Sequence, residues 1–171
     1  GKSRAFKDIF FFPTDYTEMV SSPHARIEIK DHDFVIGTQI QAEFKARGSS
    51  QVQRETLDIA AVAIECKTYL DKTTLEASST AATQLKSRNP NGLYIVVMEW
   101  LKLTQNVNLK KYAVDQIYVF RKQKNTDREY RYLDGYVKKP IDFEVVEHLF
   151  ETVRHHLTTP WSGGVADGLE R

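Results

Sequence analysis

The chain has a single cysteine and lacks any apolar run long enough to cross a membrane. One thiol, Cys66, excludes a disulfide within the chain and fits a reducing cytoplasm. A membrane-spanning helix needs about 20 mostly apolar residues. The longest apolar run, residues 93–101, is much shorter and contains Glu99. We therefore expect a cytoplasmic protein with no membrane partner.

An excess of charge of one sign is also lacking. The 24 lysines and arginines are offset by 23 acids, which leaves a net charge of +1. Proteins that coat DNA nonspecifically usually have a basic excess, so composition alone argues weakly against nucleic acid. Neither a phosphate-loop pattern nor a dinucleotide fingerprint is found, so ATP and NAD chemistry have no support. Any basic surface must come from an uneven distribution of charge.

The length and the composition predict one compact domain. The chain has 171 residues, of which 41% are apolar and 27% charged, as is usual for a globular protein. It begins with Gly-Lys-Ser rather than Met and has no signal-peptide pattern, so we expect a trimmed fragment. We divide this single domain, 1–171, into an irregular N-terminal arm (1–30), a catalytic core (31–157) and a mobile tail (158–171).

The apolar pattern predicts alternating helices and strands. Apolar side chains recur every four positions from Ile36 through Ile40 to Phe44, which predicts a helix over 36–47. The next apolar stretch, 57–70, is rich in Ile, Val and Ala and predicts a strand.

Downstream, a second helix is expected over 71–88, with Thr73 and Glu76 as its capping box. A turn, two strands and a last helix are predicted to follow, over residues 89–92, 93–101, 114–121 and 142–157 respectively. The strand over 93–101 is apolar on both faces, as in a covered central strand. This order predicts an α/β domain with a mixed central sheet flanked by helices.

An acid and a lysine lie two positions apart near the end of the strand over 57–70. Because alternate residues of a strand point to one side, Glu65 and Lys67 project together, whereas Ile64 and Cys66 face the core. Such a pair is either a surface ion pair without function or part of a catalytic site. We expect Cys66 to serve packing rather than to act as a nucleophile.

A second acid would turn this pair into a metal site. Two convergent carboxylates bind Mg²⁺, which polarises a phosphodiester and activates water, and a lysine beside it offsets the developing charge. Asp58 is our first candidate, through a hairpin that turns at residues 61–62. On one extended strand Asp58 and Glu65 would lie ~23 Å apart. Asp33 and Glu55 are therefore the alternatives for this second acid.

The triplet Glu65-Cys66-Lys67 resembles the PD-(D/E)xK nuclease superfamily. The runs VAIECKTYLDKTTLE, NPNGLYIVVMEWLKL and VDQIYVFRKQKNTDRE further resemble restriction endonucleases of the Bpu type, which cut sites containing CTNAG. This resemblance covers about residues 57–131. It implies a restriction-endonuclease-like core, Mg²⁺ or Mn²⁺ as cofactor, Asp58 and Glu65 as metal ligands and Lys67 as the catalytic lysine.

Further site residues follow from the same resemblance. Glu43, on the first expected helix, is a candidate for an extra metal-ligating acid, although a solvated helix glutamate is the plainer interpretation. Basic and polar side chains that flank the metal site are candidate DNA contacts, namely Lys72, Gln84, Lys86, Arg121, Lys122, Lys124, Arg128 and Arg131. Such side chains hold phosphates, and an arginine can read guanine. An ordinary solvated loop is the alternative for each of them.

The resulting hypothesis is a metal-dependent, sequence-specific endonuclease acting on double-stranded DNA. We expect a type II restriction enzyme, or one subunit of it, from a prokaryotic restriction-modification system. One active site cuts one strand, so a homodimer or a heterodimer with a related subunit is expected. Two alternatives remain, a structure-specific repair or recombination nuclease and a non-catalytic DNA-binding module with the same fold.

Overall fold

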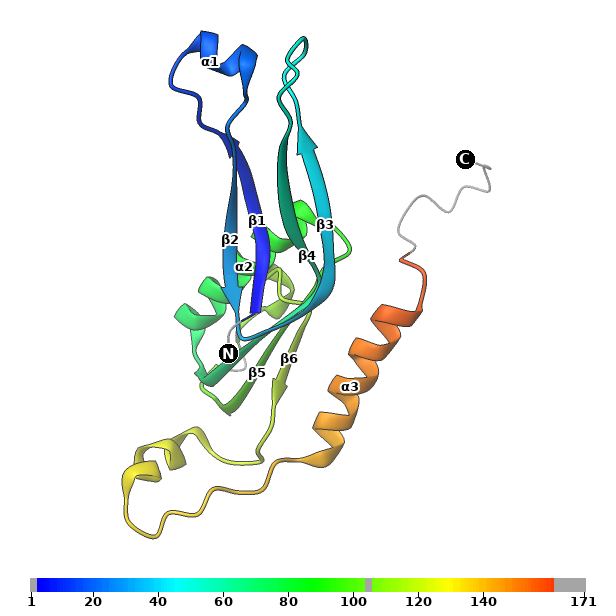
Figure 1. The fold of residues 1–171 in the computed structure, drawn as a ribbon. Coiled ribbons are helices and arrows are strands. Elements are labelled where there is room, and N and C mark those ends of the chain that lie inside the picture. The colour runs from blue at the N-terminus through cyan, green and yellow to red at the C-terminus, as the bar shows by residue number, and fades with distance from the viewer. Residues whose placement is uncertain (1–2, 104–105, 162–171) are drawn as a thin grey trace.

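The computed structural model describes residues 3–103 and 106–161. An α/β core carries a long arm made of two β-hairpins (Figure 1). The elements in chain order are β1 (Ser3–Phe11), α1 (Tyr16–Ser21), β2 (Ala25–His32), β3 (Phe34–Phe44), β4 (Gln53–Leu70), α2 (Lys72–Arg88), β5 (Leu93–Leu101), the 3-10 helix η1 (Leu109–Lys111), β6 (Gln116–Val119), the 3-10 helix η2 (Asn125–Tyr132) and α3 (Phe143–Thr158).

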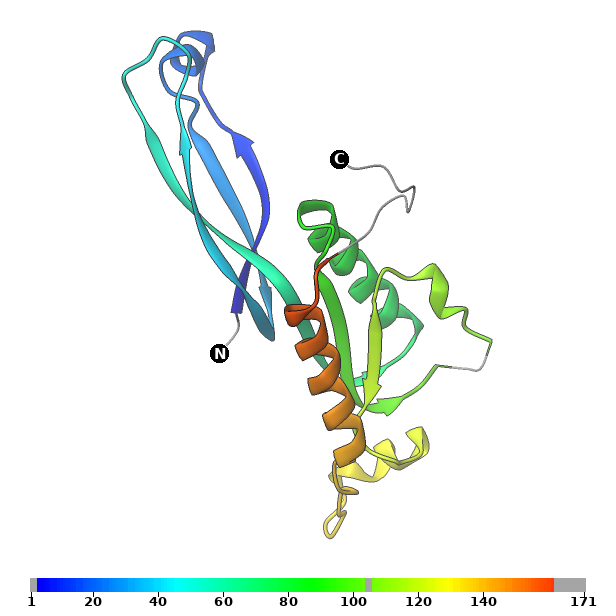
Figure 2. The same cartoon turned by 90° about the vertical axis from the view of Figure 1, so that its right-hand side faces the viewer.

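The core is built on a mixed sheet in the order β3-β4-β5-β6, which confirms the expected fold class. β3 is antiparallel to β4, whereas β4, β5 and β6 run parallel. Helix α2 covers one face, where it packs against Tyr94, Val96 and Met98. Helix α3 covers the other face, where it packs against Ile95 and Val97 (Figure 2). β5 is therefore the doubly covered central strand that its apolar run predicts.

The predicted helix over 36–47 is wrong, because residues 36–44 belong to strand β3 and residues 45–47 lie in its connection to β4. The recurrence of Ile36, Ile40 and Phe44 at every fourth position fits a helix, but four is also twice the period of a strand. Their side chains therefore share one face of either structure. β-Branched residues such as Val35 and Thr38 favour the strand, and eleven residue pairs with β4 settle the choice in the folded chain.

Residues 3–32 form a regular hairpin rather than the irregular arm expected over 1–30. β1 pairs with β2 in antiparallel register, and α1 lies in the connection between them. This hairpin lies beside the outer halves of β3 and β4, and together they form the arm that leans away from the core (Figures 1 and 2). The Gln53 side chain ties the two hairpins together, since it accepts from Ala25 N at 2.7 Å and donates to Ala25 O at 2.6 Å.

A β-bulge interrupts the pairing of β3 with β4. The register passes from Ile36 opposite Val62 to Gly37 opposite Ala60, which leaves Ala61 as the extra residue. A Cβ atom on residue 37 would lie 2.1 Å from Ile59 O, so only glycine fits this close approach. Bulges bend a strand and increase its twist, which accounts for a change of direction between core and arm.

Both helices that we expect after β4 are confirmed, but the residue that caps the first of them differs from the prediction. Asp71, rather than Thr73, caps α2, and its carboxylate accepts from Thr74 N at 2.9 Å. Across residues 3–103 and 106–161, no helix has the length and apolar character that crossing a membrane requires. Most of the tail that we expect to be mobile, residues 162–171, lies outside the described residues.

The sequence spacing places Phe143, Val146, Phe150, Val153 and Leu157 on one apolar face of the last helix, and this face is only partly buried. Val153 packs against the core together with Val145 and Leu149. Phe143 and Phe150 are instead 74% and 63% exposed. The residues of α3 that face the sheet are therefore shifted around the helix from those that the sequence pattern favours.

Candidate active site

Asp33 is the acid that meets the Glu65-Cys66-Lys67 triplet. It lies in the turn between β2 and β3, and its Oδ2 accepts a hydrogen bond from Cys66 N at 2.8 Å. Pairing of β3 with β4 begins at Phe34, opposite Ile64, and Asp33 lies one residue before this pair. Its carboxylate therefore reaches a β4 amide just beyond Ile64. This bond anchors an acid at the residue directly between Glu65 and Lys67.

Glu65 and Lys67 project to the same face of β4, as the strand period predicts. Lys67 Nζ forms an ion pair with Glu65 Oε1. The other carboxylate oxygen, Oε2, accepts a hydrogen bond from the Tyr94 hydroxyl at 2.6 Å. The side chains of Glu65 and Lys67 are 21% and 32% exposed, so the pair is half-buried but open to a ligand.

Glu65 is held in its ionised form. Burial is the strongest single influence and opposes ionisation, but the hydrogen bonds from Lys67 and Tyr94 and the charge of Lys67 outweigh it and lower the pKa of Glu65. Burial, followed by the hydrogen bond to Glu65, raises the pKa of Tyr94. The phenol therefore stays protonated and donates to a carboxylate at neutral pH.

His32 and Cys66 border this centre. His32 is 6% exposed and packs edge-on against Tyr94 at 5.8 Å between ring centroids. Burial lowers the pKa of His32, which favours the neutral ring. Cys66 is exposed, which contradicts our expectation that it faces the packed core. Partial burial and the charges of Asp33 and Glu65 raise the pKa of its thiol, so Cys66 is poorly suited to nucleophilic attack.

The donors at this centre fit a hard divalent cation. Asp33 and Glu65 supply carboxylate oxygens, and the Cys66 carbonyl lies on the same strand edge as the amide bound to Asp33. The buried Ser78 hydroxyl lies near enough to help lower the pKa of Glu65 but makes no hydrogen bond of normal geometry with the described residues.

Within the described part of the chain, no three His, Cys, Asp or Glu side chains converge on one point. Proteins usually bind Mg²⁺, however, through only one or two carboxylates, and water and phosphate oxygens complete the coordination. The set formed by Asp33 and Glu65 therefore suits Mg²⁺ better than a metal that requires a full cage of side chains.

Asp58, our first choice as the second acid, is excluded by the continuity of β4. The strand runs through 18 residues without the hairpin expected at residues 61–62, where the bulge lies instead. At ~3.3 Å per residue, Asp58 and Glu65 lie ~23 Å apart and cannot share a metal. The Asp58 carboxylate accepts from Gln39 Nε2 at 2.9 Å.

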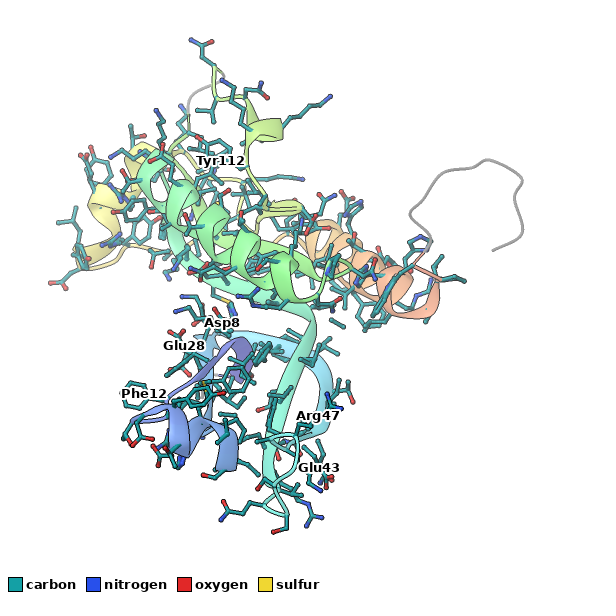
Figure 3. The ribbon with its side chains drawn as sticks, turned by 90° about the horizontal axis from the view of Figure 1, so that it is seen from above. Asp8, Phe12, Glu28, Glu43, Arg47 and Tyr112 are labelled. Carbon is teal, nitrogen blue, oxygen red and sulfur yellow. The ribbon has the colours of Figure 1, made fainter. Side chains whose placement is uncertain are left out.

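Glu43 and Glu55 also lie far from the triplet. Glu43 is on strand β3 rather than on a helix, and it accepts from Arg54 Nε at 2.7 Å. Figure 3 shows Glu43 on the arm, apart from the core. Glu55, further along β4 toward the arm, accepts from Gln53 Nε2 at 2.7 Å. The predicted role of Glu43 as an extra metal ligand is therefore wrong, and Asp33 is the alternative that the fold favours.

The basic residues after β6 gather beyond the carboxyl ends of β4 and β5. We call residues 121–139 the basic loop, which begins with Arg121 and Lys122 and includes η2. Within it, the Arg128 guanidinium lies 4.0 Å above the centre of the Tyr69 ring and that of Arg131 lies 4.4 Å from the Tyr132 ring. Both arginines thus make cation–π contacts, and their aromatic partners come from β4 and from the loop itself.

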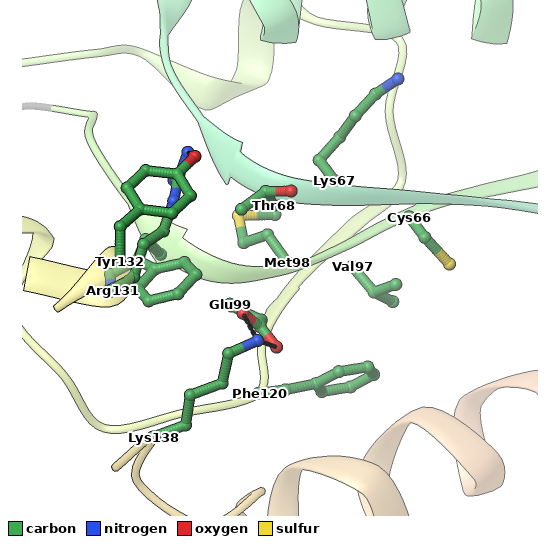
Figure 4. A pocket seen from close by; sticks show the side chains of 11 residues that line it. Cys66, Lys67, Thr68, Val97, Met98, Glu99, Phe120, Arg131, Tyr132 and Lys138 are labelled. Carbon is green, nitrogen blue, oxygen red and sulfur yellow. Dashed lines mark hydrogen bonds and ion pairs between the residues drawn. The ribbon is translucent and has the colours of Figure 1, made fainter. Parts of the chain in front are cut away.

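A cavity of about 540 Å³ separates the basic loop from the sheet (Figure 4). Lys67 and Cys66 point to opposite sides of β4, and both residues line the cavity. Glu99 lies in it and accepts from Arg121 Nε at 3.3 Å and from Lys138 Nζ at 3.0 Å. Lys67 is thus among the residues that line this cavity, whereas Glu65 is not.

The other candidate DNA contacts lie in varied surroundings. Lys122 pairs with Asp142 at 2.7 Å, and its side chain is 80% exposed. Lys72, at the start of α2, is 3.8 Å from Glu76 and 71% exposed. Lys124 is exposed before η2, and Gln84 is half-buried on α2. These positions leave the three lysines accessible to a phosphate.

Lys86 has a clear structural partner. Its Nζ donates to Ala113 O at 2.8 Å and to Asp115 Oδ1 at 2.5 Å, which ties α2 to the segment before β6. Asp115 Oδ2 also accepts from Tyr94 N at 2.7 Å. Lys86 therefore has a packing role regardless of any contact with DNA.

The fold can be compared with that of a known assembly. A chain of the solved structure described as the native BbvCI A2B2 tetramer at low resolution is similar, with a TM-score of 0.72 and 21% sequence identity. The match covers 92% of this chain and 58% of that chain, so the present chain spans a little over half of its neighbour's length. The α/β core with its arm is thus a restriction-endonuclease-like fold.

The family follows from the sequence as a whole. The model of the Bpu10I restriction endonuclease family matches residues 1–163. The chain belongs to the Bpu10I restriction endonuclease family, as the runs around Glu65-Cys66-Lys67 predict. No curated protein sequence matches it significantly.

Proposed function

We propose that this chain is the catalytic part of a type II restriction endonuclease that hydrolyses phosphodiester bonds in double-stranded DNA with the help of a divalent cation. Family membership supports the class of activity. The observation that carries the proposal is the hydrogen bond from Cys66 N to the Asp33 carboxylate, which sets a second acid beside Glu65 and Lys67.

Asp33 and Glu65 would hold the cation, Mg²⁺ or alternatively Mn²⁺, through carboxylate oxygens. When bound, such a cation supplies polarisation of the scissile phosphate and activation of a water. Glu65 is well suited to this role because Lys67 and Tyr94 keep it ionised. The Lys67 ammonium offsets negative charge on the phosphorane and orients the attacking water. Hydrolysis would leave a 5′-phosphate and a 3′-hydroxyl.

The basic loop is the proposed contact with DNA. Lys122 and Lys124 are exposed and can bind backbone phosphates. Arg128 and Arg131 lie over tyrosine rings, and a planar guanidinium suits bidentate contact with phosphate or with a guanine edge. We assign affinity for the phosphate backbone to the lysines and arginines of the loop, and orientation on the duplex to its arginines.

Cleavage of both strands requires a second active site. The similar structure is described as an A2B2 assembly, and a related subunit is accordingly the partner we propose for this chain. The pair would act on unprotected DNA in a prokaryotic cytoplasm.

Nicking of supercoiled plasmid DNA tests the proposal, because one active site suffices to cut one strand. With Mg²⁺, the wild-type chain should nick at discrete positions, whereas Asp33→Asn should not. Cleavage confined to branched DNA would favour a structure-specific nuclease instead. DNA binding that needs no divalent cation and is unaffected by Lys67→Ala, without nicking under Mg²⁺ or Mn²⁺, would identify a non-catalytic module.

A further inference from the structure

Tyr94 reaches the catalytic pair from the core of the sheet. Its side chain is fully buried on β5, opposite Ala63 of β4. Only its hydroxyl approaches the site, where it donates to Glu65 Oε2 at 2.6 Å. Because Lys67 is paired with Oε1, the two oxygens of the Glu65 carboxylate are held by different groups.

The position of Tyr94 is itself fixed by two further contacts. Its backbone amide donates to Asp115 Oδ2 at 2.7 Å, and Asp115 is in turn bound by Lys86. The ring packs edge-on against His32, the residue directly before Asp33. Tyr94 therefore connects the strand that carries Glu65 with the turn that carries Asp33.

We propose that Tyr94 is a positioning residue that fixes the Glu65 carboxylate through Oε2 and leaves Oε1 as the oxygen presented to a divalent cation. This inference rests on the proposed function. In the folded chain the Lys67 ammonium occupies Oε1, so a cation that binds there takes the place of the ammonium. Lys67 is then free to face the phosphate. The hydrogen bond from Tyr94 keeps the Glu65 carboxylate from rotating when the ammonium moves away.

If Tyr94 served only to fill the core, its hydroxyl would not need to bind Glu65. Phenylalanine would fill the same buried volume, and a buried phenol needs only some acceptor to avoid an unsatisfied hydrogen bond. The chain offers a matched comparison in Tyr118 of β6, which is 6% exposed. Its hydroxyl lies 2.8 Å from Thr152 Oγ1 and 3.0 Å from His148 Nδ1, on the α3 side of the sheet.

The test measures binding of Mn²⁺ alone by isothermal titration calorimetry, together with nicking at increasing Mn²⁺ concentrations. Tyr94→Phe should weaken Mn²⁺ binding about 10- to 100-fold, as is typical when the partner of a metal ligand is removed. Its nicking rate at saturating Mn²⁺ should fall much less than its affinity. Tyr118→Phe should leave Mn²⁺ affinity unchanged.

A double-mutant cycle separates positioning from general damage. In a Glu65→Gln background, Tyr94→Phe should cause no further loss of Mn²⁺ affinity, because the bond that it removes no longer orients a carboxylate. Equal loss in both backgrounds, or wild-type affinity in Tyr94→Phe, would overturn the inference. If the wild-type chain neither binds Mn²⁺ nor nicks DNA, the proposed function itself fails.

A measurement on the wild-type chain keeps the inference testable if Tyr94→Phe does not fold. The hydroxyl proton of Tyr94, observed by NMR, should remain hydrogen-bonded when Mg²⁺ is added to saturation. Loss of that proton signal on addition of Mg²⁺ would mean that the carboxylate turns away from Tyr94, which contradicts the proposed role.

Discussion

The Asp33 carboxylate and the Cys66 backbone amide lie 2.8 Å apart, although Asp33 lies in the turn between β2 and β3 and Cys66 lies on β4. The antiparallel pairing of β3 with β4 brings them together, since β3 begins one residue after Asp33 and opposite Ile64. This bond fixes where a second acid can act on the centre formed by Glu65 and Lys67.

Replacement of Asp33 tests this assignment most directly. We expect Asp33→Asn to reduce nicking by about 100-fold or more, a loss typical when one preorganised charged group is removed from a site. Asp58→Asn is the matched control, because Asp58 lies on the same strand as Glu65 but is bound to Gln39. Plasmid nicking at fixed Mg²⁺ measures both. Equal losses in the two variants, or none in Asp33→Asn, would contradict the assignment.

The contrast between Asp33 and Asp58 explains how much of the site is predictable from sequence. Glu65 and Lys67 share a face because of the two-residue period of their own strand, which is a local property. The second acid depends on which strand pairs with β4 and in which register, and this is set by tertiary packing. The position of Asp33 directly before the apolar run that begins at Phe34 was the available signal.

The fold shows the same division between local and distant information. The run over 93–101 is apolar at nearly every position, which only a doubly covered strand accommodates, and the prediction for β5 is confirmed. Over 36–47 the four-residue spacing was compatible with both a helix and a strand, and pairing with β4 decided between them. β2 alternates apolar and polar residues from Ala25 to Lys30, which is a strand pattern that the prediction of an irregular arm did not use, whereas β1 lacks regular alternation.

Lys67 should be required for chemistry but not for binding of the cation. Since its ammonium occupies Glu65 Oε1, Lys67→Ala should retain or tighten Mn²⁺ binding while nicking falls by about 100-fold or more. Calorimetry and plasmid nicking give the two quantities. Parallel loss of Mn²⁺ affinity and activity would indicate instead that Lys67 is needed to hold Glu65 in place.

The basic loop and Lys86 should respond differently to mutation. Arg131→Ala should weaken DNA binding and lower the slope of log affinity against log salt concentration by about 1 if it contacts one phosphate. Lys86→Ala should leave that slope unchanged but destabilise the fold by about 1 kcal/mol, because it removes the hydrogen bonds to Ala113 and Asp115. Fluorescence anisotropy in the presence of Ca²⁺ measures DNA binding, and urea unfolding measures the stability of the fold. A reduced salt slope in Lys86→Ala would assign it to the DNA contact.

Gly37 should be the glycine least tolerant of substitution in the arm. An added Cβ would lie 2.1 Å from the backbone oxygen of Ile59, so Gly37→Ala should destabilise the chain by about 1–3 kcal/mol through overpacking. Gly48 has φ +89° but open space around it, and Gly48→Ala should destabilise by only about 1 kcal/mol. Urea denaturation compares the two variants. A smaller effect at Gly37 than at Gly48 would show that the bulge can relax.

Ionisation of Glu65 should make stability depend on pH in the acid range. Burial opposes its ionisation, but Lys67 and Tyr94 outweigh burial and lower its pKa from the ordinary 4.5. A carboxyl whose pKa is lower in the folded state stabilises the fold fully above its unfolded pKa, and the contribution is lost as pH falls toward the folded value. Melting temperature measured from neutral pH to below 4.5 should therefore fall less steeply in Glu65→Gln than in the wild type. An unchanged acid limb in Glu65→Gln would mean that Glu65 is not preferentially ionised in the folded chain, and that the Lys67 and Tyr94 contacts do not stabilise its charge.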